Sequence, residues 1–85
     1  MTAEDSGSPM LAVVEVVARA LVDRPDDVHV SESLRRGMTV VKLSTAPGDM
    51  GKIIGRQGRT AAALRTLVSL AAEQRGTRAQ LDIRD

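Results

Sequence analysis

Three glycines fall within eight residues in the middle of the sequence, in the run Met50-Gly51-Lys52-Ile53-Ile54-Gly55-Arg56-Gln57-Gly58-Arg59. Glycine inside a helix costs roughly 1 kcal/mol relative to alanine, so this density needs a local reason. One reason is that glycine accepts positive φ at a turn and lets the backbone of a ligand approach closely. The run is therefore the first candidate for a binding site.

The side chains beside these glycines suit an anionic chain. Arg56 and Gln57, at the tip of the loop, can donate hydrogen bonds to phosphate oxygens. Gly58 precedes a long run of helix-forming residues, and the free N–H groups and positive dipole end of a helix start attract anions. Lys52 and Arg59 would extend the positive rim. Together these features indicate a site for a sugar-phosphate backbone.

Other glycine motifs do not fit the spacing. A Walker A loop needs Gly, four residues, Gly, Lys and then Ser or Thr, and no such register exists here. The dinucleotide pattern G-x-G-x-x-G fails because Gly51 and Gly55 are four apart and no strand is expected to run directly into the loop. These two glycines spell G-x-x-x-G, but Lys52 and Arg56 exclude a membrane helix-pairing face.

Composition limits how a nucleic acid would be held. The chain has no Phe, Tyr or Trp, so it cannot stack bases on aromatic rings as RRM, cold-shock and OB domains do. Its net charge of +1 is small, but acidic residues dominate the first half and Asp49 is the only acid between Glu32 and Glu73. An anionic partner would be drawn to the second half, in a salt-dependent way.

Catalytic and metal chemistry find little support in the residue types. There is no Cys, and the single His29 has no Cys, Asp or Glu at metal-ligand spacing. The Ser residues lack a base partner, so we expect no enzyme, no catalytic residue, no metal and no cofactor. The acidic N-terminus does not resemble a secretion signal and no stretch is long enough to span a bilayer, so we expect a cytoplasmic protein without a membrane partner.

The elements that would position the loop follow from periodicity and turn residues, and 85 residues fit one domain. We expect a flexible tail over residues 1–8, with Ser8 as a helix N-cap, and a domain over 9–85. Helices are expected over 9–22, 49–54 and 59–75, and strands over 28–34, 38–45 and 78–84. This order predicts an α/β (α+β) domain with one three-stranded sheet and helices packed on one face.

Side-chain patterns assign the inner faces. In the second strand Val41 and Leu43 should point to one face, with Val40 and Lys42 on the other. The expected inner residues of the last strand and the long helix are Ala79, Leu81 and Ile83, and Leu64, Leu67, Val68 and Ala71. The first helix is apolar around more than half its circumference, which allows a second apolar partner such as another protomer.

The segment Ile54-Gly55-Arg56-Gln57-Gly58 resembles the I-G-x-x-G core of KH domains, whose loop clamps about four nucleotides of single-stranded RNA. The expected order, α-β-β-α-α-β, is similar to the type II arrangement of prokaryotic KH domains. With the run from Gly48 to Gly55 and Gly58-Arg59-Thr60, the chain is similar to the KhpA family of small bacterial KH proteins. The likeness covers roughly residues 9–85.

Carried onto matching positions, the resemblance implies an RNA site made of Lys52, Ile53, Ile54, Gly55, Arg56, Gln57, Gly58, Arg59 and Ala61. The two loop glycines would shape the clamp and the residues between them would face phosphates. Ile53 or Ile54, with Ala61 and an apolar residue of strand 38–45, would form an aliphatic floor beneath the bases. KH domains usually carry a larger aliphatic residue at the position of Ala61, so we expect low sequence specificity.

The resemblance also implies partners and a role. It implies that the protein binds single-stranded RNA and acts as an RNA chaperone or post-transcriptional regulator. It also implies that the protein forms a homodimer, or a heterodimer with a second KH-containing bacterial protein. A protein-interaction or dimerisation module and a ribosome-associated assembly factor remain alternatives. The turn Arg35-Arg36-Gly37 is interpreted as an exposed hairpin tip, with RNA contact as the alternative.

Overall fold

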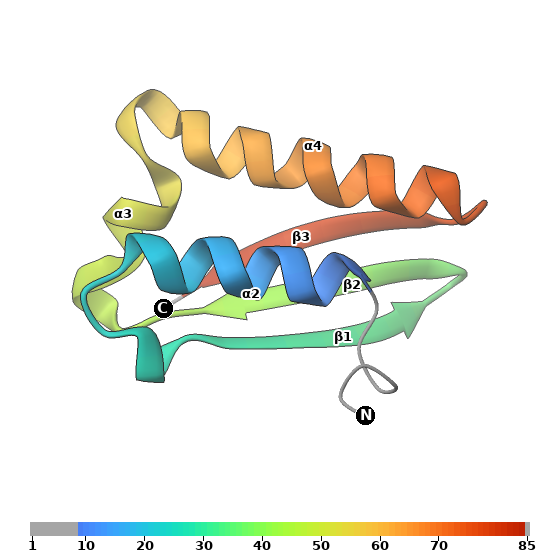
Figure 1. Ribbon diagram of the computed structural model, residues 1–85. Coiled ribbons are helices and arrows are strands. Elements are labelled where there is room, and N and C mark those ends of the chain that lie inside the picture. Colours follow the sequence, from blue (N-terminus) through green and yellow to red (C-terminus); the bar gives the residue numbers. More distant parts are fainter. Residues whose placement is uncertain (1–8, 85) are drawn as a thin grey trace.

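The computed structural model describes residues 9–84, which form a three-stranded sheet with helices on one face (Figure 1). The elements in chain order are α2 (Pro9–Leu21), η1 (Pro25–Asp27), β1 (His29–Arg35), β2 (Met38–Ser44), η2 (Pro47–Asp49), α3 (Met50–Ile54), η3 (Arg56–Gly58), α4 (Arg59–Gln74) and β3 (Arg78–Arg84), where η marks a short 3-10 helix. The predicted α+β fold and element order are confirmed. The expected tail over 1–8 and its Ser8 cap lie outside the described residues, as does Asp85.

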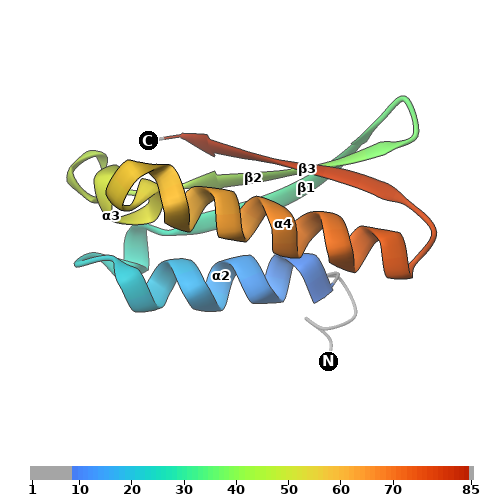
Figure 2. The ribbon, with the colours of Figure 1, turned by 90° about the horizontal axis from the view of Figure 1, so that it is seen from above.

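The strands are ordered β1-β2-β3, with β1 antiparallel and β3 parallel to β2. Arg36 and Gly37 both have positive φ, 52° and 80°, as a two-residue hairpin between twisted strands requires. The parallel pairing of β2 with β3 needs a crossover, and α3 and α4 provide it. Figure 2 shows α2 and α4 along one face of the sheet, and within residues 9–84 no element covers the other face.

The core lies between the sheet and the two long helices. On β2, Val41 and Leu43 are fully buried, as predicted. The buried residues of α2 and of α4 recur at helical spacing and are Met10, Val14 and Ala18, and Ala61, Leu64, Val68 and Ala72. No helix within residues 9–84 is long and apolar enough to cross a membrane.

The inner stripe predicted for α4 is wrong at one position. Leu67 is 46% exposed, and Ala71 is only half-buried at the edge of the core. The helix is rotated so that Ala61 and Ala72, rather than Leu67, face the sheet and α2. Sequence periodicity alone favoured the larger side chain because Leu64 and Leu67 are both leucines three residues apart.

Candidate nucleic-acid interface

The glycine loop connects α3 to α4 in four residues. Gly55, Gln57 and Gly58 all have positive φ, 77°, 58° and 73°. The Gly55 N–H donates to the Gly51 carbonyl at 2.9 Å, and the Gly58 N–H donates to the Gly55 carbonyl at 3.1 Å. These two bonds close a compact turn directly before the first residue of α4. The loop lies at the end of the molecule opposite the β1–β2 hairpin (Figure 1).

Gly55 cannot be replaced without moving its neighbours. A Cβ atom built there would lie 2.7 Å from the Cβ of Thr60 and 3.0 Å from its backbone nitrogen, and it would also meet the Thr60 hydroxyl. At Gly58 only the positive φ requires glycine, since the space beside it is open. Thr60, which packs against Gly55, was not predicted as part of the site.

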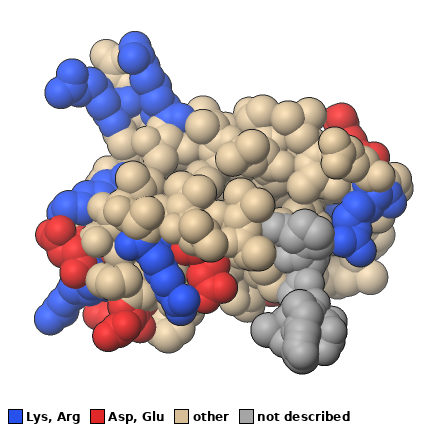
Figure 3. Space-filling view, viewed as in Figure 1, with Lys and Arg blue, Asp and Glu red and all other residues tan. Residues whose placement is uncertain are grey.

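The tip of the loop is available to a ligand. Arg56 and Gln57 are exposed, while Gly55 and Gly58 are half-buried beneath them. The exposed Arg59 guanidinium donates to the Gln57 side-chain oxygen at 3.1 Å. This bond uses the oxygen of the Gln57 amide and leaves its N–H groups available to donate to a ligand. Figure 3 shows Lys and Arg side chains projecting from the molecule where α3 meets α4. Gln57 has a left-handed φ of 58° although it is not a glycine. Such a conformation costs of order 1–3 kcal/mol and is often found in functional loops.

The aliphatic residues expected beneath the bases divide into two groups. Ile53 and Ala61 are 0% and 2% exposed and belong to the core, so their side chains offer no surface to a ligand. Ile54 is half-buried and lies beside the loop. Of the two isoleucines left open by the sequence, Ile54 is therefore the one with an accessible side chain.

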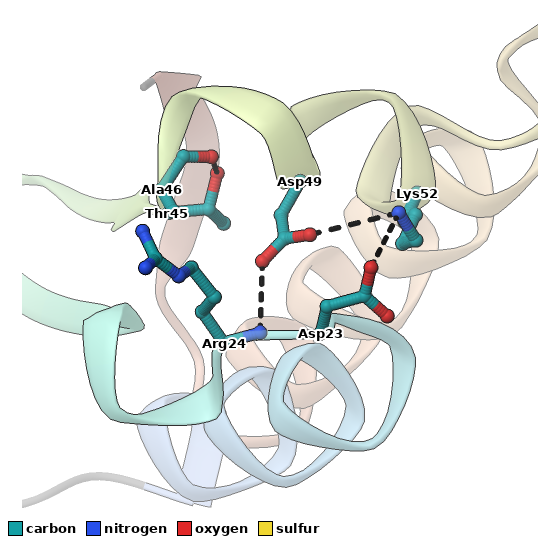
Figure 4. Close-up of polar contacts among 6 residues, drawn as sticks. All are labelled: Asp23, Arg24, Thr45, Ala46, Asp49 and Lys52. Carbon is teal, nitrogen blue, oxygen red and sulfur yellow. Dashed lines mark hydrogen bonds and ion pairs between the residues drawn. The ribbon is translucent and has the colours of Figure 1, made fainter.

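Lys52 does not provide the free positive charge expected of it. Its Nζ lies 3.2 Å from Oδ2 of Asp23 and 3.6 Å from Oδ1 of Asp49 (Figure 4). The hydrogen bond to Asp23 and the charge of that carboxylate are the main reasons that the pKa of Lys52 is raised above its usual value of 10.5. The pairing neutralises this end of the rim, so the unpaired cations at the loop are Arg56 and Arg59.

Asp49 ties the loop to the rest of the fold. The residue is only 3% exposed, and its carboxylate accepts the backbone N–H of Arg24, 25 residues earlier, at 3.0 Å (Figure 4). Burial raises the pKa of Asp49, but hydrogen bonds from the backbone N–H groups of Arg24 and Asp23 and the interaction with Lys52 lower it, and the net result is below 3.8. The end of α2 is thus held against the start of α3.

An open groove runs from α4 to the edge strand β3. Its lining includes Arg65 and Ser69 from the helix and Ala79, Gln80 and Asp82 from the strand. Arg65 is exposed on α4, and the sequence alone does not show that β3 lies beside it. The groove begins less than two helical turns beyond the loop on α4.

Comparison with known proteins places this geometry in a family. The model of the KhpA/KhpB KH domain matches residues 12–83. The chain belongs to the KhpA/KhpB family of KH domains. Curated relatives named RNA-binding protein KhpA include one from Halalkalibacterium halodurans, 53% identical over 89% of this chain and all of its own, and one from Clostridium perfringens, 45% identical over 87% and 99%. A third, from Streptomyces coelicolor, is 51% identical over 80% of this chain and 85% of its own.

This membership confirms the resemblance to bacterial KH proteins. The loop from Gly55 to Gly58 lies inside the matched region, as does every residue of the predicted site. The roles of the individual site residues remain predictions.

Proposed function

We propose that this KhpA/KhpB-family protein binds single-stranded RNA through the loop from Gly55 to Gly58, with little preference for base sequence. The observation that carries the proposal is the exposed Arg56–Gln57 tip, held by two glycines of positive φ directly before the start of a 16-residue helix. The curated relatives named RNA-binding protein KhpA support it.

The clamp would hold the backbone of the RNA rather than its bases. The start of α4 is the positive end of the helix dipole, which favours a phosphate near Gly58, although the Arg59 N–H itself donates to the Arg56 carbonyl. Arg56 and Arg59 supply unpaired charge, and the Gln57 amide supplies hydrogen-bond donors. Successive nucleotides would continue along the groove between α4 and β3, past Arg65.

Weak base discrimination follows from what lies beneath the bases. The chain has no Phe, Tyr or Trp to stack on. Ile53 and Ala61 are inside the core, which leaves Ile54 as the aliphatic surface beside the loop. Recognition by backbone geometry with a shallow floor suits an RNA chaperone or a post-transcriptional regulator that acts on many transcripts.

The test is the double variant R56D/Q57D, titrated with fluorescently labelled single-stranded RNA at several salt concentrations. Aspartate tolerates positive φ, so the loop conformation should survive, and circular dichroism should be unchanged. If the clamp neutralises two or three phosphates, the wild-type slope of log K against log salt should be about −1.4 to −2. The variant should lose most affinity and most of this slope. Unaltered affinity and slope would show that the loop does not hold RNA.

A second proposal concerns pairing with another KH protein. An apolar groove between α2 and α4 is lined by Met10 and by Val13, Leu67 and Leu70, which are 41%, 46% and 51% exposed. We propose that this groove forms the contact in a homodimer or in a heterodimer with a second KH-containing bacterial protein, which would raise RNA affinity by avidity. Sedimentation velocity of wild type and of L67E/L70E over a range of concentrations would test it, since only wild type should associate.

A further inference from the structure

The uncovered face of the sheet carries more unpaired positive charge than the loop. A hollow on this face, here called the sheet hollow, is lined by four cations, Arg35, Arg36, Lys42 and Arg84, and one carboxylate, Asp82. These residues contribute +4 and −1, or +3 in sum, whereas the whole chain carries +1, so the remainder of the chain carries −2. The positive charge of this nearly neutral protein is therefore concentrated on one face.

None of the four cations forms an ion pair with another residue that the structure describes. Within residues 9–84 the ion pairs involve Arg19, Arg24 and Lys52 but no cation of the sheet hollow. Lys42 and Asp82 are register partners on β2 and β3, yet they form no ion pair, and the Asp82 carboxylate instead accepts the Gln80 amide at 3.4 Å. Unpaired like charges gathered on one surface attract a polyanion.

The spacing of these cations fits a chain of phosphates rather than one anion. Arg35 is opposite Met38 at one end of β2, and Arg84 is opposite Ser44 at the other, with Lys42 between them. Six residues of strand span roughly 20 Å, so a single phosphate cannot reach both ends. Met38, which is half-buried, gives the hollow some apolar surface.

The sheet hollow adjoins the groove between α4 and β3. Gln80 and Asp82 on the edge strand β3 line both of them. An RNA strand that leaves the groove past Arg65 therefore needs only to cross the edge of β3 to enter the hollow.

We propose that the sheet hollow is a second contact for single-stranded RNA, which binds the phosphates of nucleotides beyond those held at the loop. The inference rests on the proposed function in that both contacts serve one RNA strand. It predicts that affinity depends on RNA length: a short RNA reaches only the loop, and a longer one reaches both surfaces.

The experiment compares wild type with R35Q/K42Q/R84Q, using labelled oligouridines of about five nucleotides, enough for the loop alone, and about three times that length. For the longer RNA the wild-type salt slope should be about −3 to −4, because two or three more phosphates add roughly 0.7 each. In the variant the slope should fall to that of the short RNA, and affinity should fall about tenfold. Binding of the short RNA should not change.

The control R19Q/R24Q/R75Q removes the same formal charge from exposed positions on other parts of the surface. Because Arg19 and Arg24 are ion-paired with Glu15 and Asp27, it tests the change in net charge rather than the loss of unpaired cations. It should bind the longer RNA like wild type. If it loses as much affinity as R35Q/K42Q/R84Q, or if the latter binds the longer RNA like wild type, the inference is overturned. If circular dichroism shows that the triple variant is misfolded, R35Q/R84Q, which changes only exposed side chains, takes its place.

Two further outcomes separate this inference from its alternatives. If R56D/Q57D has no effect while R35Q/K42Q/R84Q removes binding of the longer RNA, the sheet hollow stands and the loop proposal fails. If polyglutamate displaces the longer RNA as effectively as unlabelled RNA does, the hollow accepts acidic polypeptide and the inference is overturned.

Discussion

The glycine loop and the sheet hollow both present positive charge, but the fold builds them in different ways. At the loop, positive φ at Gly55 and Gly58 and the contact of Gly55 with Thr60 fix the path of the main chain. Among residues 9–84, the cations there without an ion pair are Arg56 and Arg59, because Lys52 is paired. In the hollow, cations on long side chains project from regular strands over roughly 20 Å. The loop therefore has a fixed backbone conformation and few charged groups. The hollow has more positive charges, and they lie on long, flexible side chains.

Lys52 shows that the two regions should be compared by their unpaired cations rather than by the total number of Lys and Arg residues. It stands within the glycine run, yet Asp23 and Asp49 neutralise it. Lys42, on the open sheet face, has no ion pair although Asp82 is its register partner. Position in the sequence therefore does not show which of the two lysines is ion-paired in the described part of the chain.

The largest effect is expected from Gly55→Ala, which should break the loop and leave the sheet hollow intact. Alanine is disfavoured at φ 77° and its Cβ would meet Thr60, so we expect a loss of 1–3 kcal/mol or more in unfolding free energy. Binding of short RNA should be lost. Urea denaturation and anisotropy measure the two effects.

The control for this prediction is Gly51→Ala in α3. Gly51 has open space around it and no positive φ, so alanine should be neutral or stabilising by up to about 1 kcal/mol. Equal destabilisation by both substitutions would refute the special role of Gly55.

A substantial effect on stability is expected from Asp49→Asn. It removes the charge that accepts the Arg24 N–H and pairs with Lys52, and these two contacts are here called the tether. Because the folded state lowers the pKa of Asp49 below 3.8, its ionised form contributes stability that is fully present above that value and is lost as pH falls through the folded pKa. Wild type should therefore lose stability in strong acid, and Asp49→Asn should be less stable at neutral pH and lose less on acidification.

Thermal unfolding across pH would measure this difference, with Asp26→Asn as the exposed control. A control that changed the acid dependence as much as Asp49→Asn would show that general charge, rather than the tether, is responsible.

A smaller effect distinguishes free from paired cations at the loop. Arg56→Gln should make the salt slope for short RNA shallower by about 0.7 to 1, because it removes one phosphate contact. Lys52→Gln should leave that slope nearly unchanged, because its charge is already compensated by two carboxylates. Anisotropy titrations at several salt concentrations measure both, and equal changes in slope would contradict the assignment.

The smallest effect is expected from Leu67→Gln, because Leu67 lies away from both the glycine loop and the sheet hollow. An exposed substitution of this kind should change the stability of the monomer by no more than about 0.5 kcal/mol and leave the affinity of a single domain for short RNA unchanged. Its buried neighbour on α4 provides the contrast, since Leu64→Ala should cost about 2–5 kcal/mol. Similar losses in urea denaturation would place Leu67 in the core after all.

Local features of the sequence determined the fold and the location of the loop. The element order and the turn before α4 could be predicted without coordinates. The signals for them are glycine spacing, turn residues and the alternation at Val41 and Leu43, and each acts over a few residues. The absence of Phe, Tyr and Trp likewise excludes stacking on these rings in any conformation.

Only the tertiary structure decided which side chains are available to a ligand. The pairing of Lys52 with Asp23, the burial of Ile53 and Ala61 and the exposure of Leu67 depend on how distant segments pack together. The sheet hollow gathers Arg35, Lys42 and Arg84 from three strands, and only the strand register brings them onto one face. Charge neutralisation and burial depend on contacts between residues far apart along the chain, and sequence spacing does not specify those contacts.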